Sequence, residues 1–219
     1  MARPRVTLKL ATSMDGRIAL SNGVSQWITG IASRARSHQM RAAHDAVLVG
    51  VGTVLADDPL LTARGLPLPK RQPIRIVADS KARTPVASRL VQSAGLGRVV
   101  IATAELNAPR ELEYLAAGAE CWSCGGSDGR VDPLELFRRA EVEGIGSIFL
   151  EGGGQLAASF MKAGCIDRLE WFRAPILIGG DGYPALGDLG LTSMDGLPRW
   201  HRVSSEVIGE DTLETWHPA

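Results

Sequence analysis

GIGSIFLEGGGQLAASFMKAG, residues 144–164, is the stretch that decides the fold. The apolar run Ile148–Leu150 predicts a buried strand, and the apolar spacing over Gln155–Ala163 predicts a helix that Gly164 ends. Between them, Glu151 and three consecutive glycines predict a turn that leaves backbone N–H groups free at a helix N-terminus, where a phosphate can bind. The residues alone leave two interpretations open, a ligand site at this turn or an ordinary connection between a strand and a helix.

A second unit of strand, glycine turn and helix lies at residues 46–58. Its strand ends in GVGT, residues 50–53, which is a second candidate phosphate site. Further strands are predicted at 5–11, 73–79, 98–102, 120–122, 167–173 and 176–178, and helices at 33–43, 109–117 and 132–143. This alternation predicts an α/β protein with a doubly wound, mostly parallel sheet, and the extended runs within 200–216 predict a C-terminal antiparallel hairpin. Ligands of such sheets bind at the carboxyl ends of the strands.

Three polar groups stand out beside these elements. Lys9 lies in the middle of the first predicted strand and has to face a cleft if both faces of the sheet are covered. Arg34, His38 and Arg41 recur at helical spacing and share one face, which is either solvated or an anion-binding surface. The segment Ser80–Arg83 brings a hydroxyl and two cations to a strand end. A ribose 2′-phosphate can be read there, although an ordinary polar loop has the same composition.

The composition suits one domain with a substantial apolar core, since 45% of the 219 residues are apolar. The formal net charge of zero disfavours nucleic acid or a membrane surface as a partner. No run approaches the roughly 20 apolar residues of a membrane span, and the three cysteines fit a reducing compartment, so we expect a cytoplasmic protein. Cys121 and Cys124 have the spacing of half a zinc site or of a redox pair. No second pair and no suitably spaced histidine accompany them, which favours an incidental pair and no metal site.

The chain resembles the reductase domain of riboflavin biosynthesis, the C-terminal half of a bifunctional deaminase-reductase. The resemblance covers nearly the whole chain and rests on LKLATSMDGRIAL (8–20), SQWIT (25–29), HDAVLVGVGTVLADDPLLTAR (44–64), PIRIVADS (73–80), FLEGGGQLAASF (149–160) and APILIGG (174–180). It implies a dihydrofolate reductase-like fold, a single reductase domain over residues 1–219 and a homodimer. The implied reaction is the NADPH-dependent reduction of 5-amino-6-(5-phosphoribosylamino)uracil to its ribitylamino form.

The resemblance also implies a set of site residues. Positions that match contacts with the substrate, largely around its phosphate, are Ser25, Arg41, Leu61 and Arg64. Lys9 and Glu151 match polar groups at the reacting end, where we expect Lys9 to supply a proton and Glu151 to contact and orient the substrate. Ser80, with Arg83 as a helper, matches the reader of the 2′-phosphate. Further cofactor contacts are implied at Ala11, Trp27, Thr53, Asp57, Gly153, Gly154, Gln155, Leu156, Ala157, Ala158 and Ser159.

Other functions remain open at this point. The deaminase signature H-x-E followed by P-C-x-x-C is absent from the sequence, so the chain also resembles the stand-alone reductases that act on the diaminopyrimidinone precursor before deamination. A pterin or folate-like substrate is a second alternative, which the cluster of Ser25, Arg41 and Arg64 disfavours because such a substrate carries no phosphate. A non-catalytic nucleotide-binding module is the third, and the presence of Lys9 and Glu151 counts against it.

Overall fold

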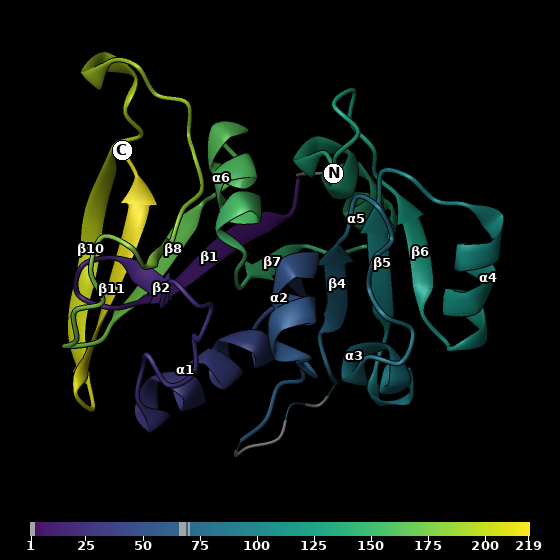
Figure 1. Ribbon diagram of the computed structural model, residues 1–219, viewed down its shortest axis with the longest axis horizontal. Coiled ribbons are helices and arrows are strands. Elements are labelled where there is room, and N and C mark those ends of the chain that lie inside the picture. Colours follow the sequence, from purple (N-terminus) through teal and green to yellow (C-terminus); the bar gives the residue numbers. More distant parts are fainter. Residues whose placement is uncertain (1–2, 66–68, 70) are drawn as a thin grey trace.

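The computed structural model describes residues 3–65, 69 and 71–219, and within them nine strands form one continuous sheet (Figure 1). The strands are β1 (Arg5–Thr12), β3 (Ala46–Gly50), β4 (Ile74–Ala78), β5 (Val99–Thr103), β6 (Glu120–Ser123), β7 (Ser147–Leu150), β8 (Arg168–Arg173), β10 (Trp200–Ile208) and β11 (Asp211–Pro218). Their order across the sheet is β10, β11, β8, β1, β7, β3, β4, β5, β6. Every neighbouring pair from β8 to β6 is parallel, whereas β11 pairs antiparallel with both β8 and β10. The mostly parallel sheet and its C-terminal hairpin are therefore confirmed.

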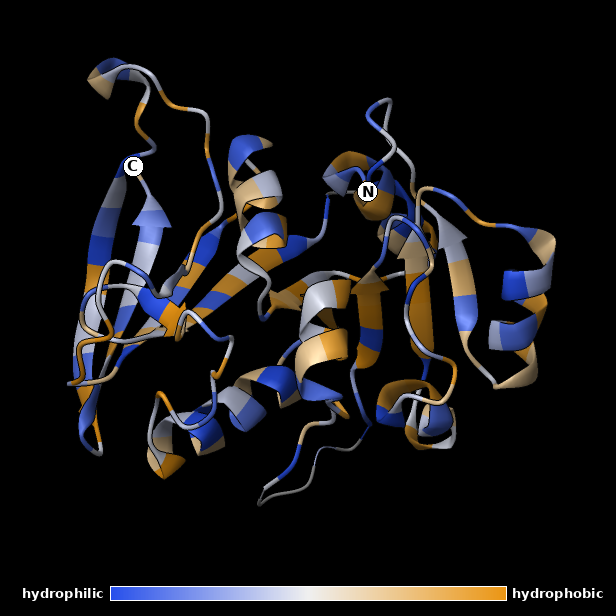
Figure 2. Cartoon of the chain, in the orientation of Figure 1, coloured by the Kyte–Doolittle hydropathy of each residue, from blue (hydrophilic) through white to orange (hydrophobic). Residues whose placement is uncertain are grey.

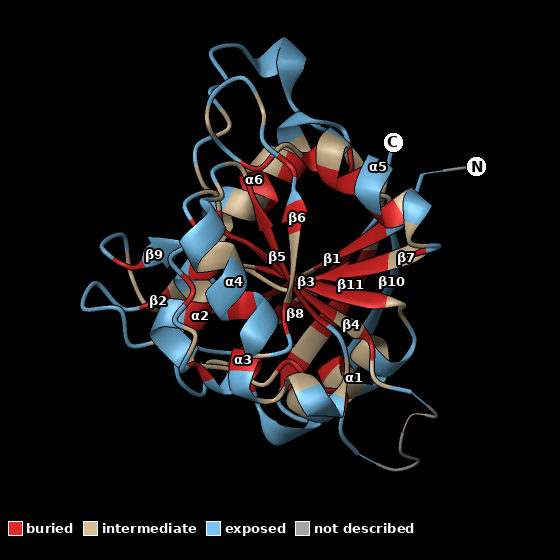
Figure 3. Cartoon of the chain, turned by 90° about the vertical axis from the view of Figure 1, so that its right-hand side faces the viewer, coloured by how far each residue is buried: buried red, intermediate tan, exposed pale blue. Residues whose placement is uncertain are grey.

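Helices cover both faces of this sheet (Figure 3). On one face lie α1 (Ile31–Ala42), α2 (Val51–Asp57), α3 (Arg89–Gln92) and α4 (Ala108–Ala116), and on the other lie α5 (Pro133–Val142) and α6 (Gly154–Lys162). Two separate apolar cores result: Val54, Leu90 and Tyr114 pack on the first face, whereas Phe137 and Phe160 pack on the second. The doubly wound arrangement is thus confirmed.

Hydropathy follows this layering (Figure 2). All five residues of β5 are buried, and the strand is hydrophobic over most of its length, as a strand covered on both faces should be. The helix α4 is banded in the figure, because its apolar residues alternate with charged ones that meet solvent. None of the helices in the described part of the chain combines the length and the apolar character that a bilayer crossing requires.

The helix α1 begins at Ile31, two residues before the predicted start, because a distant residue caps it. Its N-cap residue, Gly30, provides no side chain, and its first turn carries no acid. The carboxylate of Asp211, at the start of β11, fills this role: its Oδ2 accepts hydrogen bonds from the N–H of Gly30 (2.7 Å) and from the hydroxyl of Ser33. The negative charge also complements the positive end of the helix dipole.

The predicted strand at 176–178 is wrong. These residues form an irregular segment in which the N–H groups of Ile178 and Gly179 donate to the carboxylate of Asp15 (3.1 and 2.8 Å). The carbonyl of Ile176 accepts from Met14 (2.8 Å), so the backbone groups of the segment are used by the loop after β1 instead of by a neighbouring strand. A small second sheet lies beyond it and joins β2 (Arg17–Ala19) to β9 (Tyr183–Pro184).

Candidate active site

The residues expected at the reacting end meet because β7 lies between β1 and β3. Leu8 pairs with Leu150 in the parallel register, so the next residues, Lys9 and Glu151, occupy neighbouring positions near the carboxyl ends of their strands. The same register brings Gly50, the last residue of β3, beside the turn that follows β7. The sheet topology therefore assembles one site from three separate parts of the sequence.

Glu151 is engaged by Arg41, which projects from the last turn of α1. The Nε and Nη2 groups of Arg41 donate to the two carboxylate oxygens of Glu151, the second at 2.9 Å, and Nη1 donates to the carbonyl of Thr62 (3.1 Å). The side chains are 14% and 6% exposed. Burial opposes the charge of Arg41, but the attraction of Glu151 and its hydrogen bonds outweigh this effect and raise the pKa of Arg41. The pair is a two-point contact with little solvent screening.

Lys9 is partly exposed, but the surroundings of its ammonium group are largely desolvated. Among the described residues no hydrogen bond or ion pair reaches its ammonium group, which lies 5.9 Å from the centre of the Phe172 ring. Burial lowers the pKa of Lys9; the negative charge of Glu151 acts against this shift, and the positive charge of Arg41 adds to it. A lysine in such a position gives up its proton more readily than an exposed one, as a proton donor should.

Two arginines and a histidine gather around the segment that contains Thr62. His38 on α1 places its Nδ1 3.2 Å from this carbonyl, which Arg41 also contacts. Burial lowers the pKa of His38, and the charges of Arg41 and Arg64 lower it further. Arg64 is exposed, whereas Leu61 is buried with a positive φ of 54°. Arg41 and Arg64 both act on His38 and so lie in one region, but Arg41 is occupied by Glu151 and the Thr62 carbonyl, and the expected contacts of both arginines with a substrate stay a prediction.

Ser25 and Trp27 lie in the segment before α1. Burial raises the pKa of the Asp57 carboxyl, and a hydrogen bond from Ser25 opposes this shift, so these two residues, expected on substrate and cofactor respectively, are neighbours. Trp27 is 72% exposed, has a positive φ of 69° and lies 4.4 Å from the guanidinium of Arg34. A cation over the ring holds this large exposed side chain in place.

The glycine turn, Gly152–Gly154, has the geometry of a phosphate cradle. Gly152 and Gly153 have positive φ values of 139° and 87°, which side chains disfavour. The N–H of Gly50 donates to the carbonyl of Gly152 (3.3 Å), so the N-termini of α2 and α6 are adjacent. Within the described residues the N–H groups of the glycine turn donate to no other protein group, and they remain available to a pyrophosphate. These features fit a dinucleotide cofactor.

The remaining expected cofactor residues surround this turn. Thr53 approaches it, since a Cβ on Gly152 would lie 3.7 Å from its hydroxyl oxygen. Gly154 is covered by the segment 184–187, whose Gly187 N–H donates to the Gly154 carbonyl (2.8 Å). Gln155 is exposed, Ala157 and Ala158 are buried, and the residues with intermediate exposure are Ala11, Leu156 and Ser159.

The two cysteines of the C-x-x-C spacing point to opposite faces of the sheet. Cys121 packs against the core under α4, whereas Cys124 belongs to the core under α5. Burial raises the pKa of each thiol to about 11. They can neither share a metal ion nor form a disulfide in this fold, and no group of three or more potential metal-binding side chains occurs in the described part of the chain.

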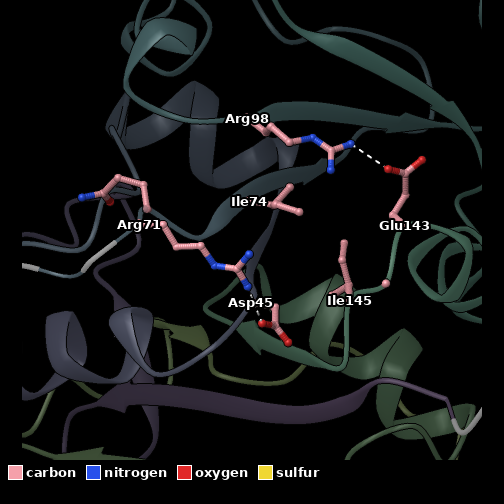
Figure 4. Close-up of a pocket in the computed structure, with 8 residues that line it drawn as sticks. Asp45, Arg71, Ile74, Arg98, Glu143 and Ile145 are labelled. Carbon is pink, nitrogen blue, oxygen red and sulfur yellow. Dashed lines mark hydrogen bonds and ion pairs between the residues drawn. The ribbon is translucent and has the colours of Figure 1, made fainter.

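A cavity of about 210 Å³ lies at the opposite end of the sheet, at the amino ends of β4, β5 and β7 (Figure 4). In the figure Arg71 points to Asp45 and Arg98 points to Glu143, with ion-pair distances of 3.1 and 2.8 Å. Its charged groups are satisfied by one another, and it is remote from Lys9 and the glycine turn. We therefore place the candidate active site at the carboxyl ends.

The sequence profile of the RibD C-terminal domain matches residues 4–213. The chain belongs to this family. RibD from Actinobacillus pleuropneumoniae is 40% identical over 96% of this chain and 56% of its own length. A 2,5-diamino-6-ribosylamino-4(3H)-pyrimidinone 5′-phosphate reductase from Methanothermobacter thermautotrophicus is 35% identical over 96% of both chains. The structure of Acinetobacter baumannii RibD superposes with a TM-score of 0.85 at 26% identity, over 99% of this chain and 58% of that one.

Membership of the RibD C-terminal domain family agrees with the fold, and the dihydrofolate reductase-like architecture expected from the sequence is confirmed. The chain spans little more than half the length of the RibD proteins it matches. Two features of the site were not foreseen from the sequence: the direct pairing of Arg41 with Glu151 and the capping of α1 by Asp211. Only the lack of a capping side chain and of an early acid in α1 hints at the second.

Proposed function

We propose that this protein is an NADPH-dependent reductase of a phosphorylated ribosylaminopyrimidine, in the reductase step of riboflavin biosynthesis. The observation that carries the proposal is the placement of Lys9, without a hydrogen-bonding partner among the described residues, beside the Arg41–Glu151 pair and at the same end of the sheet as the glycine turn. The names of the family relatives support the same step.

The residues divide the chemistry among them. NADPH, when bound, supplies a hydride to C1 of the ring-opened ribose. We assign its pyrophosphate to the N–H groups of the glycine turn and its 2′-phosphate to Ser80 and Arg83. Lys9 delivers the proton to the atom that loses its double bond to C1, and its lowered pKa favours this transfer. Glu151, fixed by Arg41, orients the substrate, while Arg64 and Ser25 bind its phosphate.

Two substrates fit this site. The deaminated compound, 5-amino-6-(5-phosphoribosylamino)uracil, is our first assignment. The diaminopyrimidinone precursor is the second, because the relative that matches along nearly its whole length is named for that compound. The two differ by an amino group and a carbonyl on the pyrimidine ring, whereas the ribose phosphate and the reacting carbon are common to both.

The direct test follows the loss of NADPH absorbance with the purified protein and each substrate in turn. Oxidation with the uracil compound alone places the protein after deamination, and oxidation with the diaminopyrimidinone alone places it before. A folded protein that binds NADPH but oxidises it with neither compound refutes the assigned substrate class while the cofactor assignment stands.

We further propose a cytoplasmic homodimer. The edge strand β10 exposes most of its residues, including Val203 (54%) and Val207 (79%), which leaves a long strand for a second copy to cover. The molar mass from light scattering should correspond to two chains, and Val207→Asp should shift it toward one. A wild-type monomer at micromolar concentration contradicts this assignment.

A further inference from the structure

Asp79 is the residue after β4, and only one of its two carboxylate oxygens accepts hydrogen bonds. Its Oδ2 accepts hydrogen bonds from the N–H (2.6 Å) and the hydroxyl (2.8 Å) of Thr84. Its Oδ1 is buried and receives no hydrogen bond within the described residues. Among the described residues Arg83 alone forms an ion pair with Asp79, and its Nε lies 4.0 Å from Oδ1. Since the side chain of Asp79 is fully buried, its charge has to be balanced by such neighbours.

The segment Ser80–Thr84, which we call the specificity loop, is held from two sides. From inside, Asp79 closes it through Thr84, and the carbonyl of Asp79 accepts from Ala82 (3.1 Å). From α4, the hydroxyl of Tyr114 contacts the carbonyl oxygens of Ala82 (3.1 Å) and Thr84 (2.7 Å). Ala82 has a positive φ of 50°, a conformation that a side chain disfavours and that these contacts maintain.

A second residue of α4 strengthens this attachment. The Nε and Nη2 groups of Arg110 donate to the same two carbonyl oxygens, at 3.2 and 2.8 Å. The loop is therefore fixed in the protein before any ligand arrives, and the side chains of Lys81 and Arg83 remain exposed. Because the loop is already fixed, it loses little conformational entropy when its two cations bind an anion.

Ser80 completes the arrangement. Its hydroxyl oxygen accepts a hydrogen bond from the N–H of Val131 (3.1 Å), so its own proton is free to donate to an anion. Its carbonyl oxygen accepts hydrogen bonds from the N–H of Glu105 (3.0 Å) and from the hydroxyl of Thr103 (3.2 Å). One hydroxyl donor and two cations on a rigid loop match a phosphate monoester.

We propose that Asp79 is a positioning residue for cofactor specificity: it fixes the specificity loop and draws Arg83 over it, so that the protein prefers the dinucleotide that carries a 2′-phosphate. This inference rests on the proposed function. Asp79 itself is buried and touches no cofactor; it acts through Arg83. Arg83 alone is an exposed side chain with many conformations, and the attraction of the buried carboxylate restricts them.

The test measures the dissociation constants of NADPH and NADH by calorimetry for the wild type, Asp79→Asn, Arg83→Ala and the double variant. Arg83→Ala should lower the preference for NADPH about tenfold or more, as the loss of a charge-assisted hydrogen bond does, and Asp79→Asn about fivefold. The double variant should be no worse than Arg83→Ala, because both changes remove one interaction. Lys81→Ala, a cation on the same loop, should lower the preference independently of Asp79.

An unchanged preference in a folded Asp79→Asn protein overturns the proposal, and so does an increased one, which would show that the carboxylate repels the phosphate. If Asp79→Asn does not fold, Thr84→Val carries the test, since it loosens the loop without touching either charge; an unchanged preference again overturns the proposal. A wild type that binds neither dinucleotide refutes the proposed function instead, and the two failures are thereby distinguished.

Discussion

Arg41 and Glu151, 110 residues apart in the chain, form a two-point ion pair at the carboxyl end of the sheet. The pair joins α1 to the strand that carries the glycine turn. It also leaves Glu151 committed to a guanidinium, so the neighbouring ammonium of Lys9 is not neutralised by a direct contact with the carboxylate. The relationship explains how two cations and one carboxylate coexist in a site with little solvent.

Glu151→Gln should abolish most of the activity and destabilise the protein. Breaking a buried ion pair costs about 3–5 kcal/mol, because the remaining charge is left without its partner. Loss of the negative charge should also lower the pKa of Lys9 further, so any residual activity should lose its basic limb at a lower pH. A pH–rate profile and thermal unfolding check both effects.

Glu214→Gln is the matched control for Glu151. This carboxylate is 4% exposed and pairs with Arg173 (2.9 Å) and Arg202 (3.3 Å), but it lies on β11, which β8 separates from β1 and Lys9. It should lower stability and leave the pH–rate profile in place. A shifted profile in Glu214→Gln contradicts the local role of Glu151.

Lys9→Met should remove activity and stabilise the protein at neutral pH. The pKa of Lys9 is lowered by burial, so the unfolded chain binds more protons between the lowered value and the ordinary value of 10.5. The charge of Lys9 therefore costs stability below that window, and the cost disappears as pH rises through it. Each kcal/mol gained should raise the melting temperature by about 2–4 °C.

Unfolding measured at several pH values checks this prediction. The advantage of Lys9→Met over the wild type should shrink on the alkaline side, whereas Lys162→Met, at an exposed position, should have nearly no effect at any pH. A Lys9→Met protein less stable than the wild type at neutral pH argues against a buried charge.

Gly153→Ala should abolish NADPH binding. A φ of 87° penalises any side chain by about 1–2 kcal/mol and displaces the N–H groups of the glycine turn. Gly164→Ala is the control, since Gly164 ends the same helix with a φ of 62° and has no neighbour within 4 Å. Calorimetry should show similar losses of stability but a loss of NADPH affinity in Gly153→Ala alone. Equal affinities would remove the cradle from the cofactor site.

Arg64→Ala should raise KM for the phosphorylated substrate about tenfold to a hundredfold, the range expected when a charge-assisted hydrogen bond of about 1.5–3 kcal/mol is lost. The KM for NADPH should not change. Arg36→Ala, which removes a cation paired with Glu206 on the outer side of α1, should affect neither constant. Equal increases in both KM values for Arg64→Ala would contradict the assignment of Arg64 to the substrate phosphate.

Asp211→Ala should destabilise the protein by about 1–2 kcal/mol, the cost of losing a helix cap, and loosen the N-terminus of α1. Amide hydrogen exchange should accelerate in the first turn of α1 before it does so in β4 or β5. Uniform acceleration across the whole sheet would show that Asp211 stabilises the hairpin and not the helix.

Much of the architecture could be predicted from local patterns in the sequence. The apolar runs before the two glycine turns became β3 and β7, and Asp132 is the N-cap of α5, where its side chain accepts from Leu134. These features depend on residues close in sequence. The strand predicted at 176–178 does not form. Leu177 is 69% exposed, and the N–H of Ile178 donates to the Asp15 carboxylate, a contact that no pattern of apolar residues reveals.

The site depended on contacts that no local pattern contains. The residue types at positions 9, 41 and 151 suggested polar chemistry, but their proximity follows from the insertion of β7 between β1 and β3. The partner of Asp57 was likewise unforeseen, because Ser25 reaches it from a loop without regular structure. Pair contacts across a parallel sheet need the strand order, and one sequence does not provide it.

Because Asp211 caps α1 from β11, the helix cannot be fully stabilised until β11 has been synthesised. As the chain leaves the ribosome, α1 emerges long before the carboxylate that fixes its first turn, because Gly30 and Asp211 are 181 residues apart. The strand β1 likewise has no pairing partner at first, because its neighbours β7 and β8 are made more than 130 residues later. Thr7, for example, pairs with Phe149 and Arg168. Such distant pairings slow folding. A nascent chain therefore holds its binding residues unassembled until β7, β8 and β11 have all been made.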